Sequence, residues 1–448
     1  MTTKKPVITF KQINALAIPA IIAGIVEPLL SITDTAIVGN IKINSTESLA
    51  AVGIAGSLIS ALIWILAQSR SAISATIARY YGAEKLEEIH ILPAQVLSIN
   101  LILSLIVYVI SITFAESIFR MYNAEGLLLN YTIQYYNIRA IGLPFTLLTF
   151  SIFGVFRGLQ NTFWPMVISI IGAVLNVGLD YLLVFGVEGF IEPMHIEGAA
   201  IASVIAQITM SILAFFFMLW KTPFRLKLIF PLHKEVKQIV IITINLFLRA
   251  LSLNVALYMA NAYATSYGEA HIAAQTIAFQ IWLFFAFFID GYSSVGNIVS
   301  GKLLGQGNFN GLAELSRIIS KYAIVISIIL AVLFFALYKP IGEMFTDEKD
   351  VLKLFYDVFW IVILMQPLNA IAFVFDGIFK GMADATTLRN TLIIATFIGF
   401  VPTLLLGDYF QYELYGIWLA FTVWMLFRAG ILIWKFKTKI LTQNITNE

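Results

Sequence analysis

Residues 91–113 read ILPAQVLSINLILSLIVYVISIT and contain no charged side chain. A helix needs about 20 consecutive, largely apolar residues to cross the ~30 Å hydrocarbon core of a bilayer, and this stretch supplies them. The strands of a membrane β-barrel would instead alternate polar and apolar residues over about ten positions. That alternation is absent from the sequence, so the stretch predicts a transmembrane helix.

The composition of the whole chain agrees with this interpretation. Of 448 residues, 60% are hydrophobic and only 12% are charged, whereas soluble domains carry about 25% charged residues. The chain has no cysteine, which excludes disulfides, cysteine metal sites, iron–sulfur clusters and thiol nucleophiles. The net charge of +2 gives no basic face of the kind that nucleic-acid binding requires.

Further apolar runs divide the chain into twelve predicted spans, so we expect an all-α membrane protein with twelve transmembrane helices. The first run is too long for a cleaved signal peptide and is followed by eleven more. The runs lie at about 13–40, 48–69, 91–113, 130–156, 163–186, 198–220, 238–262, 271–300, 318–338, 355–380, 390–410 and 414–436.

The distribution of Lys and Arg predicts the orientation. If the N-terminus is cytoplasmic, 20 Lys and Arg fall on the cytoplasmic side and six, Arg139 among them, on the opposite side. Cytoplasmic connections carry the excess of Lys and Arg in membrane proteins. We therefore expect a multi-pass protein of the plasma (inner) membrane with both termini in the cytoplasm.

The second half of the chain repeats the first at a fixed offset. When the chain is shifted so that Pro144 falls on Pro367, FRGLQN falls on FKGMAD and Met121 on Met344. The repeat predicts two homologous six-helix lobes, 1–221 and 238–448, joined by a cytoplasmic linker at 222–237. Lobes with an even number of spans are parallel repeats related by a pseudo-twofold axis along the membrane normal, an arrangement that transporters use for alternating access.

Five acids lie within the predicted spans, namely Glu27, Asp34, Asp180, Asp290 and Asp376. A carboxylate at the centre of a bilayer costs about 2.5–3.5 kcal/mol on insertion scales, so acids inside spans are candidates for function. Each one can alternatively be a paired residue or a residue at a helix end.

The N-terminal lobe holds the more informative group. Asp34 and Asp180 lie at similar depths, and Asn176 precedes Asp180 by one helical turn and so shares its face. Ser203 lies about five residues into span six, counted from the same side of the membrane, and so at the same depth. Such a group can exchange a proton or bind a monovalent cation through its oxygens; a structural polar cluster is the alternative. Glu27 can extend a relay toward the cytoplasm or pair locally. The aligned second-lobe positions hold Leu257, Gly399 and Thr403, so the acids are not needed to form the lobe.

The charges within the C-terminal lobe have a simpler interpretation. Arg249 lies near the middle of span seven, and Asp290 and Asp376 lie in the inner halves of spans eight and ten. We expect a buried Arg–Asp ion pair there, with part of a substrate or gating site as the alternative. Arg157 and Lys380 are expected to end their helices at the inner interface.

Several motifs together resemble the multidrug and toxic compound extrusion (MATE) family, and within it the DNA-damage-inducible F-like (DinF) branch. They are PLLSITDTAIVG in span one, GVFRGLQNT after span four, NVGLD in span five, GAAIASVIAQ in span six and FVFDGIFKGMAD in span ten. The span-one and span-five motifs carry most of this resemblance.

The resemblance implies a secondary antiporter and not an enzyme. Such an antiporter would export cationic or amphipathic organic compounds in exchange for protons or sodium ions and would need no cofactor. A transporter of two lobes can work as a monomer, which is what we expect here. Asp34 would be the essential acid, with Asn176, Asp180 and Ser203 as its partners. Span seven offers Arg249 and none of the acids that some branches carry there, which favours coupling through the N-terminal lobe.

Two other functions stay open. A lipid-linked precursor flippase of the same superfamily would show a more basic cavity for pyrophosphate. A membrane-embedded enzyme is remote, because neither D-x-x-x-D metal motifs nor paired YD and GxGD strings occur and the four histidines do not cluster.

Overall fold

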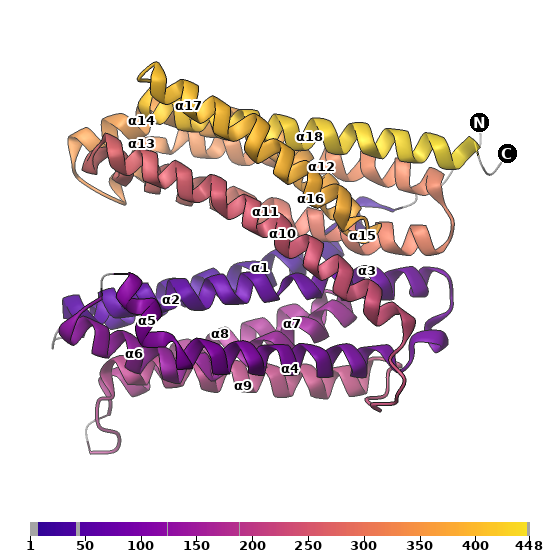
Figure 1. Cartoon of the computed structure of the whole chain (residues 1–448), viewed down its shortest axis with the longest axis horizontal. Helices are drawn as coiled ribbons and strands as arrows, with labels where there is room; N and C mark the ends of the chain where they lie inside the picture. The colour runs from indigo at the N-terminus through magenta and orange to yellow at the C-terminus, as the bar shows by residue number, and fades with distance from the viewer. Residues whose placement is uncertain (1–7, 42–44, 123, 188, 446–448) are drawn as a thin grey trace. The chain divides into compact units, whose positions relative to one another are not determined.

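The computed structural model describes residues 8–41, 45–122, 124–187 and 189–445, with the side chains left out at 27–32, 45–46 and 441–445. In this part of the chain the regular structure is helical, and no strand is formed. The protein is an all-α membrane protein, as the sequence predicts (Figure 1).

The helices fall into two groups along the chain. The first group is α1 (Phe10–Gly39), α2 (Ser45–Leu66), α3 (Gln68–Gly82), α4 (Leu92–Thr113), α5 (Ala115–Met121), α6 (Gly126–Ala140), α7 (Gly142–Gly158), α8 (Phe163–Phe185) and α9 (His195–Lys221). The second group is α10 (Lys234–Tyr267), α11 (Glu269–Gly305), α12 (Phe309–Ala336), α13 (Tyr338–Glu343), α14 (Lys349–Leu364), α15 (Gln366–Gly381), α16 (Ala385–Ile394), a π-helical turn (Ala395–Phe400), α17 (Val401–Tyr409) and α18 (Glu413–Ile445).

The helices cluster into two compact units. The N-terminal unit comprises Ile22–Ile77 and Glu84–Val240; the C-terminal unit comprises Ile241–Glu448 together with Met1–Ile21 and Ala78–Ala83. The boundary therefore lies just after the predicted linker. The predicted division into 1–221 and 238–448 differs from this in one respect, because it assigns Met1–Ile21 and Ala78–Ala83 to the N-terminal lobe.

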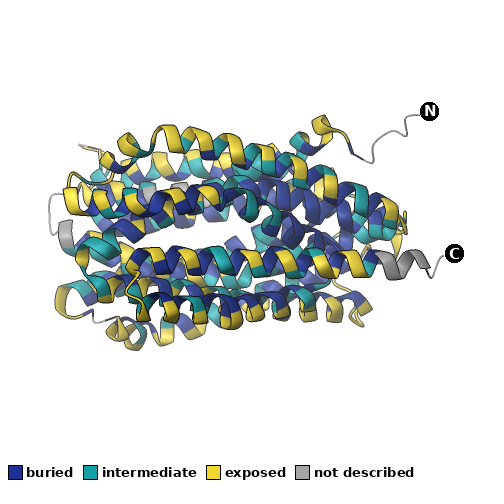
Figure 2. Cartoon of the chain, turned by 90° about the horizontal axis from the view of Figure 1, so that it is seen from above, coloured by how far each residue is buried: buried dark blue, intermediate teal, exposed yellow. Residues whose placement is uncertain are grey.

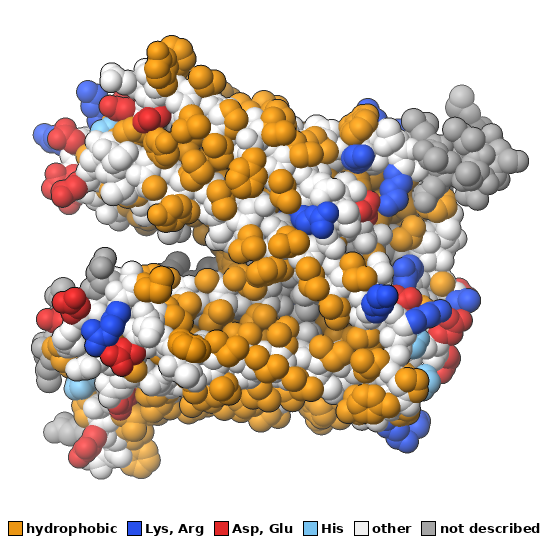
Figure 3. Space-filling model, viewed as in Figure 1, with side chains coloured by type: hydrophobic (Ala, Val, Ile, Leu, Met, Phe, Trp, Pro, Cys, Tyr) orange, Lys and Arg blue, Asp and Glu red, His pale blue; other side chains and the backbone are white. Residues whose placement is uncertain are grey.

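Every predicted span coincides with a helix or with a pair of consecutive helices. Among the described residues, nine helices are individually long and apolar enough to cross a membrane, and two bent pairs add one span each. Helix α1, with an apolar part at Phe10–Val26, corresponds to the remaining prediction. On the face that Figure 3 shows, apolar side chains cover the middle of the helices and charged ones gather at the helix ends.

Spans four and ten are bent, where the sequence predicted continuous helices. Helices α6 and α7 meet at 41° and α14 and α15 at 50°. Pro144 lies in the first turn of α7 and Pro367 in that of α15. Proline has no N–H to donate and its ring crowds the preceding turn, so a proline at the start of the second helix is compatible with a break.

The bends, the helix ends and the turn conformations follow the same repeat. The segment Gly126–Gly158 corresponds to Lys349–Gly381 in both its ends and its bend. Gln160 and Ala383 are equivalent positions of the repeat, and both take the left-handed conformation, with φ of 63° and 59°. That conformation is uncommon outside glycine, so its occurrence at matching positions supports a duplicated backbone.

The repeated motifs GVFRG (154–158) and GIFKG (377–381) mark close helix contacts inside each unit. A Cβ on Gly154 of α7 would lie 2.7 Å from the carbonyl oxygen of Arg70 in α3. In the C-terminal unit, a Cβ on Gly377 or Gly381 of α15 would lie 2.0 or 2.2 Å from a carbonyl oxygen of α11. Small residues four apart let membrane helices approach this closely.

The predicted linker is attached to the N-terminal unit by one buried side chain. Gln95 of α4 is fully buried, and its amide donates to the carbonyl oxygens of Ile229 at 2.7 Å and Pro231 at 3.2 Å. Its own oxygen accepts from the backbone N–H of His233 at 2.8 Å. Gln95 therefore satisfies three backbone groups of a segment that forms no helix of its own.

Buried residues lie on the sides of the helices that face other helices, and exposed residues lie on the outer sides (Figure 2). In the C-terminal unit the core centres on Trp418, Phe421 and Trp424 of α18, which pack against α11, α14 and the π-helical turn. In the N-terminal unit it includes Phe119, Tyr135 and Tyr136. Both cores leave a small number of charged side chains buried, and these define the candidate sites.

Candidate functional site

An acidic cluster lies inside the N-terminal unit, formed by Asp34 of α1, Asn176 and Asp180 of α8 and Ser203 of α9. The Ser203 hydroxyl donates to Asp34 Oδ2 at 2.9 Å, and Asn176 Nδ2 donates to the Ser203 oxygen at 3.2 Å. All four side chains are at most 4% exposed. The structure thus brings together the four residues that the sequence placed at one depth.

The cluster leaves several buried oxygen atoms without a donor. Within the described part of the chain, Asp34 Oδ1, Asn176 Oδ1 and both carboxyl oxygens of Asp180 have no hydrogen-bond partner. Buried polar groups are normally hydrogen-bonded, and a buried carboxylate without a partner is costly. The four acceptor atoms therefore form a site suited to a proton or a small cation.

Asp34 and Asp180 also interact with each other. Their carboxyl groups are close enough that a proton on one would let it donate to the other. Two like charges in a low-dielectric interior repel strongly, so this pair favours a state that carries at least one added positive charge. A single proton can form the bridge, and a monovalent cation can be held by the same oxygens.

One basic residue lies near this pair. Arg139 of α6 attracts Asp180 electrostatically and contacts Tyr135 one turn before it on the same helix. Among the described residues Arg139 forms no ion pair, and its Nη1 has no hydrogen-bond partner. Arg139, which we counted with the basic residues of the outer side, lies in the first half of a bent span, within the predicted run 130–156.

Glu27 belongs to α1, but its side chain lies outside the described residues, so its place in a relay stays a prediction. In the parts of the chain that are described, no group of three or more His, Asp or Glu side chains is arranged to hold a metal ion. The oxygens of Asp34, Asn176 and Asp180 are hard ligands, which alkali and alkaline-earth cations prefer to soft ones.

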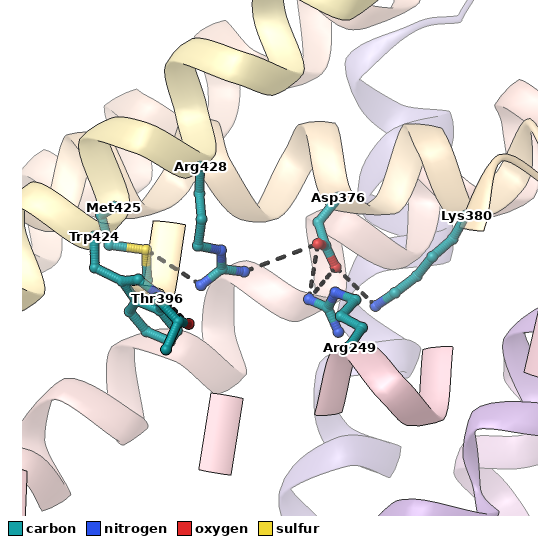
Figure 4. Close-up of polar contacts among 7 residues, drawn as sticks. All are labelled: Arg249, Asp376, Lys380, Thr396, Trp424, Met425 and Arg428. Atoms are coloured by element: carbon teal, nitrogen blue, oxygen red, sulfur yellow. Dashed lines mark hydrogen bonds and ion pairs between the residues drawn. The ribbon is translucent and has the colours of Figure 1, made fainter. Parts of the chain in front are cut away.

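The C-terminal unit contains a cluster of the opposite kind around Asp376 of α15 (Figure 4). Arg249 Nη2 donates to both Asp376 oxygens at 2.7 Å, and Lys380 Nζ lies 3.0 Å from Oδ2. Arg428 Nη2 is 3.8 Å from Oδ1. Three bases surround one acid, so this cluster cannot serve as a cation site.

Arg428 of α18 is held by more than Asp376. Its guanidinium lies 4.9 Å from the centre of the Trp424 ring and 5.3 Å from that of Phe373, and Nη1 contacts the Met425 sulfur at 3.3 Å. Aromatic faces stabilise a desolvated cation. The cluster around Asp376 therefore joins α10, α15 and α18 as a buried ionic link.

The expected Arg–Asp pair is thus formed by Arg249 and Asp376, and Asp290 is not part of it. Asp290 of α11 is half-buried and forms no ion pair or hydrogen bond among the described residues. Lys380 does end its helix as expected, but its side chain turns back to Asp376. The i,i+4 spacing of Asp376 and Lys380 is a signal that could have predicted this contact.

Comparison with known proteins identifies the family. The family model MatE matches residues 19–182 and again 242–405, two segments that cover well over half of the chain and begin and end at equivalent positions of the repeat. The chain belongs to the MatE family. It is therefore a multi-pass membrane transporter of the multidrug and toxic compound extrusion type and not an enzyme.

Individual relatives extend this match over nearly the whole chain. The chain is 28% identical to Protein DETOXIFICATION 44, chloroplastic, of Arabidopsis thaliana, over 96% of this chain and 82% of that protein. It is 23% identical to DNA damage-inducible protein F of Escherichia coli, over 95% and 92% respectively.

The fold of the MatE family is also found among solved structures. A crystal structure of MATE in the bent conformation matches with a TM-score of 0.89 at 21% sequence identity, covering 97% of this chain and 96% of the other. The crystal structure of the Vibrio cholerae MATE transporter VcmN in the bent form matches with the same TM-score at 18% identity, covering 97% of this chain and 98% of the other. At this level of identity the likeness establishes the fold alone.

Proposed function

We propose that the protein is a secondary antiporter that exports small cationic or amphipathic organic compounds in exchange for protons, with sodium as the alternative coupling ion. The observation that carries this proposal is the set of buried, unpartnered oxygens on Asp34, Asn176 and Asp180 in the described part of the chain. An ion can drive a transporter from one conformation to another only if it binds the second conformation more tightly than the first. A buried site of unpartnered oxygens can provide this difference in affinity.

The coupling step follows from the charges of the cluster. An ion that binds from the outside neutralises the repulsion between Asp34 and Asp180 and lets the helices that carry them approach. Release to the inside restores the repulsion. Ser203 is bonded to Asp34 and Asn176, so it can transmit a movement of α1 to α8 and α9. Arg139, the nearby base, favours loss of the bound cation.

The C-terminal unit supports this assignment by exclusion. Its buried acid Asp376 is already compensated by Arg249 and Lys380, so this carboxylate is not free to hold a second cation. The three bases are at most 16% exposed as side chains. They therefore do not provide the accessible basic surface that a lipid-linked pyrophosphate would need.

In this proposal the protein works as a monomer of two lobes, 1–221 and 238–448, joined by the segment 222–237. It lies in the plasma membrane with both termini in the cytoplasm. Multidrug export proteins among the relatives, such as MepA of Staphylococcus haemolyticus, at 24% identity, support export of small organic compounds.

The test is transport in proteoliposomes with pH and sodium gradients imposed separately. A fluorescent organic cation is the probe, and the wild type is compared with Asp34→Asn, which keeps the shape of the side chain and removes its charge. We expect export driven by one of the two gradients in the wild type and loss of at least tenfold in the variant. Gradient-driven export that persists in Asp34→Asn would overturn the proposed coupling.

A further inference from the structure

The C-terminal unit has a groove between α12, α15 and α18 that is separate from both charged clusters. It has a volume of about 450 Å³. Arg317, Ser320 and Lys321 of α12 line one part of it, and Ile371 and Phe375 of α15 and Ile433 of α18 line the other. A basic part and an apolar part therefore share one cavity.

The position of the groove along α12 matches the boundary of a bilayer. Lys321 is the last charged residue of this helix, and residues 322–338 carry no charge over 17 positions. At 1.5 Å per residue they span about 25 Å, which is close to the thickness of the hydrocarbon core. Lys321 and Arg317 thus lie at headgroup level, and the apolar residues Ile324 and Val325, about one turn further along α12, lie deeper.

The two bases of the groove are available to a ligand. Arg317 and Lys321 are exposed and form no ion pair among the described residues. The Ser320 hydroxyl is buried and has no hydrogen-bond partner within the described part of the chain. One face of α12 therefore presents two exposed cations at the mouth of an apolar groove, and a buried hydroxyl without a described partner lies between them in the sequence.

We propose that this groove binds an anionic phospholipid, with its phosphate at Arg317 and Lys321 and an acyl chain along Ile371, Phe375 and Ile433. Basic pockets between transmembrane helices bind anionic lipid headgroups. The part of the groove that α12 lines runs from position 316 to position 325, about 14 Å at the helical rise, which is enough for part of one acyl chain beside a headgroup. Lipid binding here is independent of the transported substrate and of the coupling ion.

The test is lipid retention by the full chain, measured by native mass spectrometry with phosphatidylglycerol and phosphatidylcholine as probes. Arg317→Gln combined with Lys321→Gln removes both cations. Lys435→Gln combined with Lys437→Gln is the matched control, since it removes two exposed cations of α18 that do not line the groove. Val325→Trp fills the apolar part from an exposed position.

We expect the wild type to retain phosphatidylglycerol in preference to phosphatidylcholine, and the Arg317/Lys321 variant to lose about fivefold in affinity for each charge removed. The control pair should keep the wild-type value, and Val325→Trp should weaken retention of both lipids. Glycerophosphoglycerol, which has the headgroup without acyl chains, should not compete. Equal retention of the two lipids, equal loss in both charge variants, or competition by the headgroup alone would overturn the proposal.

Discussion

The acidic cluster of the N-terminal unit and the ionic cluster of the C-terminal unit are both buried, yet they differ in how their charges are compensated. Asp34 accepts one hydrogen bond, from the Ser203 hydroxyl, and among the described residues the other three oxygens of Asp34 and Asp180 have no donor. Asp376 is contacted by Arg249 and Lys380 at 2.7 and 3.0 Å.

This difference separates a role in function from a role in stability. Removing one partner of a buried ion pair strongly destabilises a protein, because the other charge is left buried and unpaired. A buried charge that has no partner already destabilises the folded state, so removing it has no such effect. The two clusters do not occupy equivalent positions, because the first-half counterparts of Asp376 and Arg249 in the repeat are Phe153 and Val26. Each copy of the repeat therefore acquired its own charged cluster.

The largest effect is expected from breaking the ionic cluster. Asp376→Asn leaves the buried Arg249 and Arg428 and the partly buried Lys380 without a counter-charge, so the unfolding free energy should fall by about 3–5 kcal/mol. Thermal unfolding of the purified protein measures this. Asp290→Asn is the matched control, because it removes a half-buried acid of the same unit that has no described partner, and its loss should stay below about 1 kcal/mol. Similar losses in the two variants would contradict a structural role for Asp376.

Asp180→Asn should have the reverse outcome. It removes a carboxylate whose oxygens have no hydrogen-bond partner among the described residues, so we expect unchanged or higher thermal stability. Export driven by an ion gradient should fall at least tenfold, and the Asp290→Asn control should retain it. A drop in stability as large as that of Asp376→Asn would instead make the acidic cluster a structural one.

A smaller effect is expected at Ser203, which links the two sides of the acidic cluster. Ser203→Ala removes one donor to Asp34 and one acceptor for Asn176, worth about 1 kcal/mol for a hydrogen bond of this kind. The ion concentration for half-maximal export should shift by about fivefold. Ser203→Thr keeps the hydroxyl and should restore the wild-type value; an equal shift in both variants would show that size and not bonding matters.

The smallest effect is expected at Asp384, which caps α16 outside the spans. Burial raises the pKa of its carboxyl group, but Lys439 at 3.0 Å and the bonds from Thr387 outweigh burial and hold the pKa below its ordinary value. A carboxyl group whose pKa is lower in the folded than in the unfolded state stabilises the folded protein at pH values above its unfolded-state pKa. This stabilisation is lost as the pH falls through the folded-state pKa.

Asp384→Asn should therefore cost less than about 1 kcal/mol at neutral pH, since asparagine still caps the helix. Thermal unfolding followed from pH 7 down to pH 3 should show this difference shrinking below the ordinary pKa of about 3.9. A difference that stayed constant over the whole range would mean that the Asp384 charge adds no stability.

The sequence was sufficient to predict the spans and the four residues of the acidic cluster, for separate physical reasons. The absence of charge over a stretch as long as 91–113 defines a span without reference to packing. The one-turn spacing of Asn176 and Asp180 places both on one face of α8, and their common depth with Asp34 follows from span ends. Depth alone does not say which helices are neighbours, and the hydrogen bonds through Ser203 had to come from the structure.

The bends of spans four and ten and the position of Arg139 were not predicted. Pro19 lies inside α1, which continues through it, so proline alone does not mark a break in a membrane helix. The repeat of Pro144 at Pro367 is the signal that separates these two prolines from the others. Arg139 was counted with the outer basic residues although it lies within the predicted run 130–156, and the structure places it near enough to Asp180 to attract it.

Helix α1 has a consequence for how far the two copies of the repeat can be treated as separate proteins. Its first part, up to Ile21, belongs to the C-terminal unit, where Asn14 accepts from the Tyr292 hydroxyl at 3.0 Å and Ala17 and Ile21 cover Gly291. A gene fragment that encodes residues 238–448 alone would lack this segment. Cutting the chain at its linker therefore does not recover the ancestral half, because part of the first helix of one copy now packs in the unit formed by the other copy.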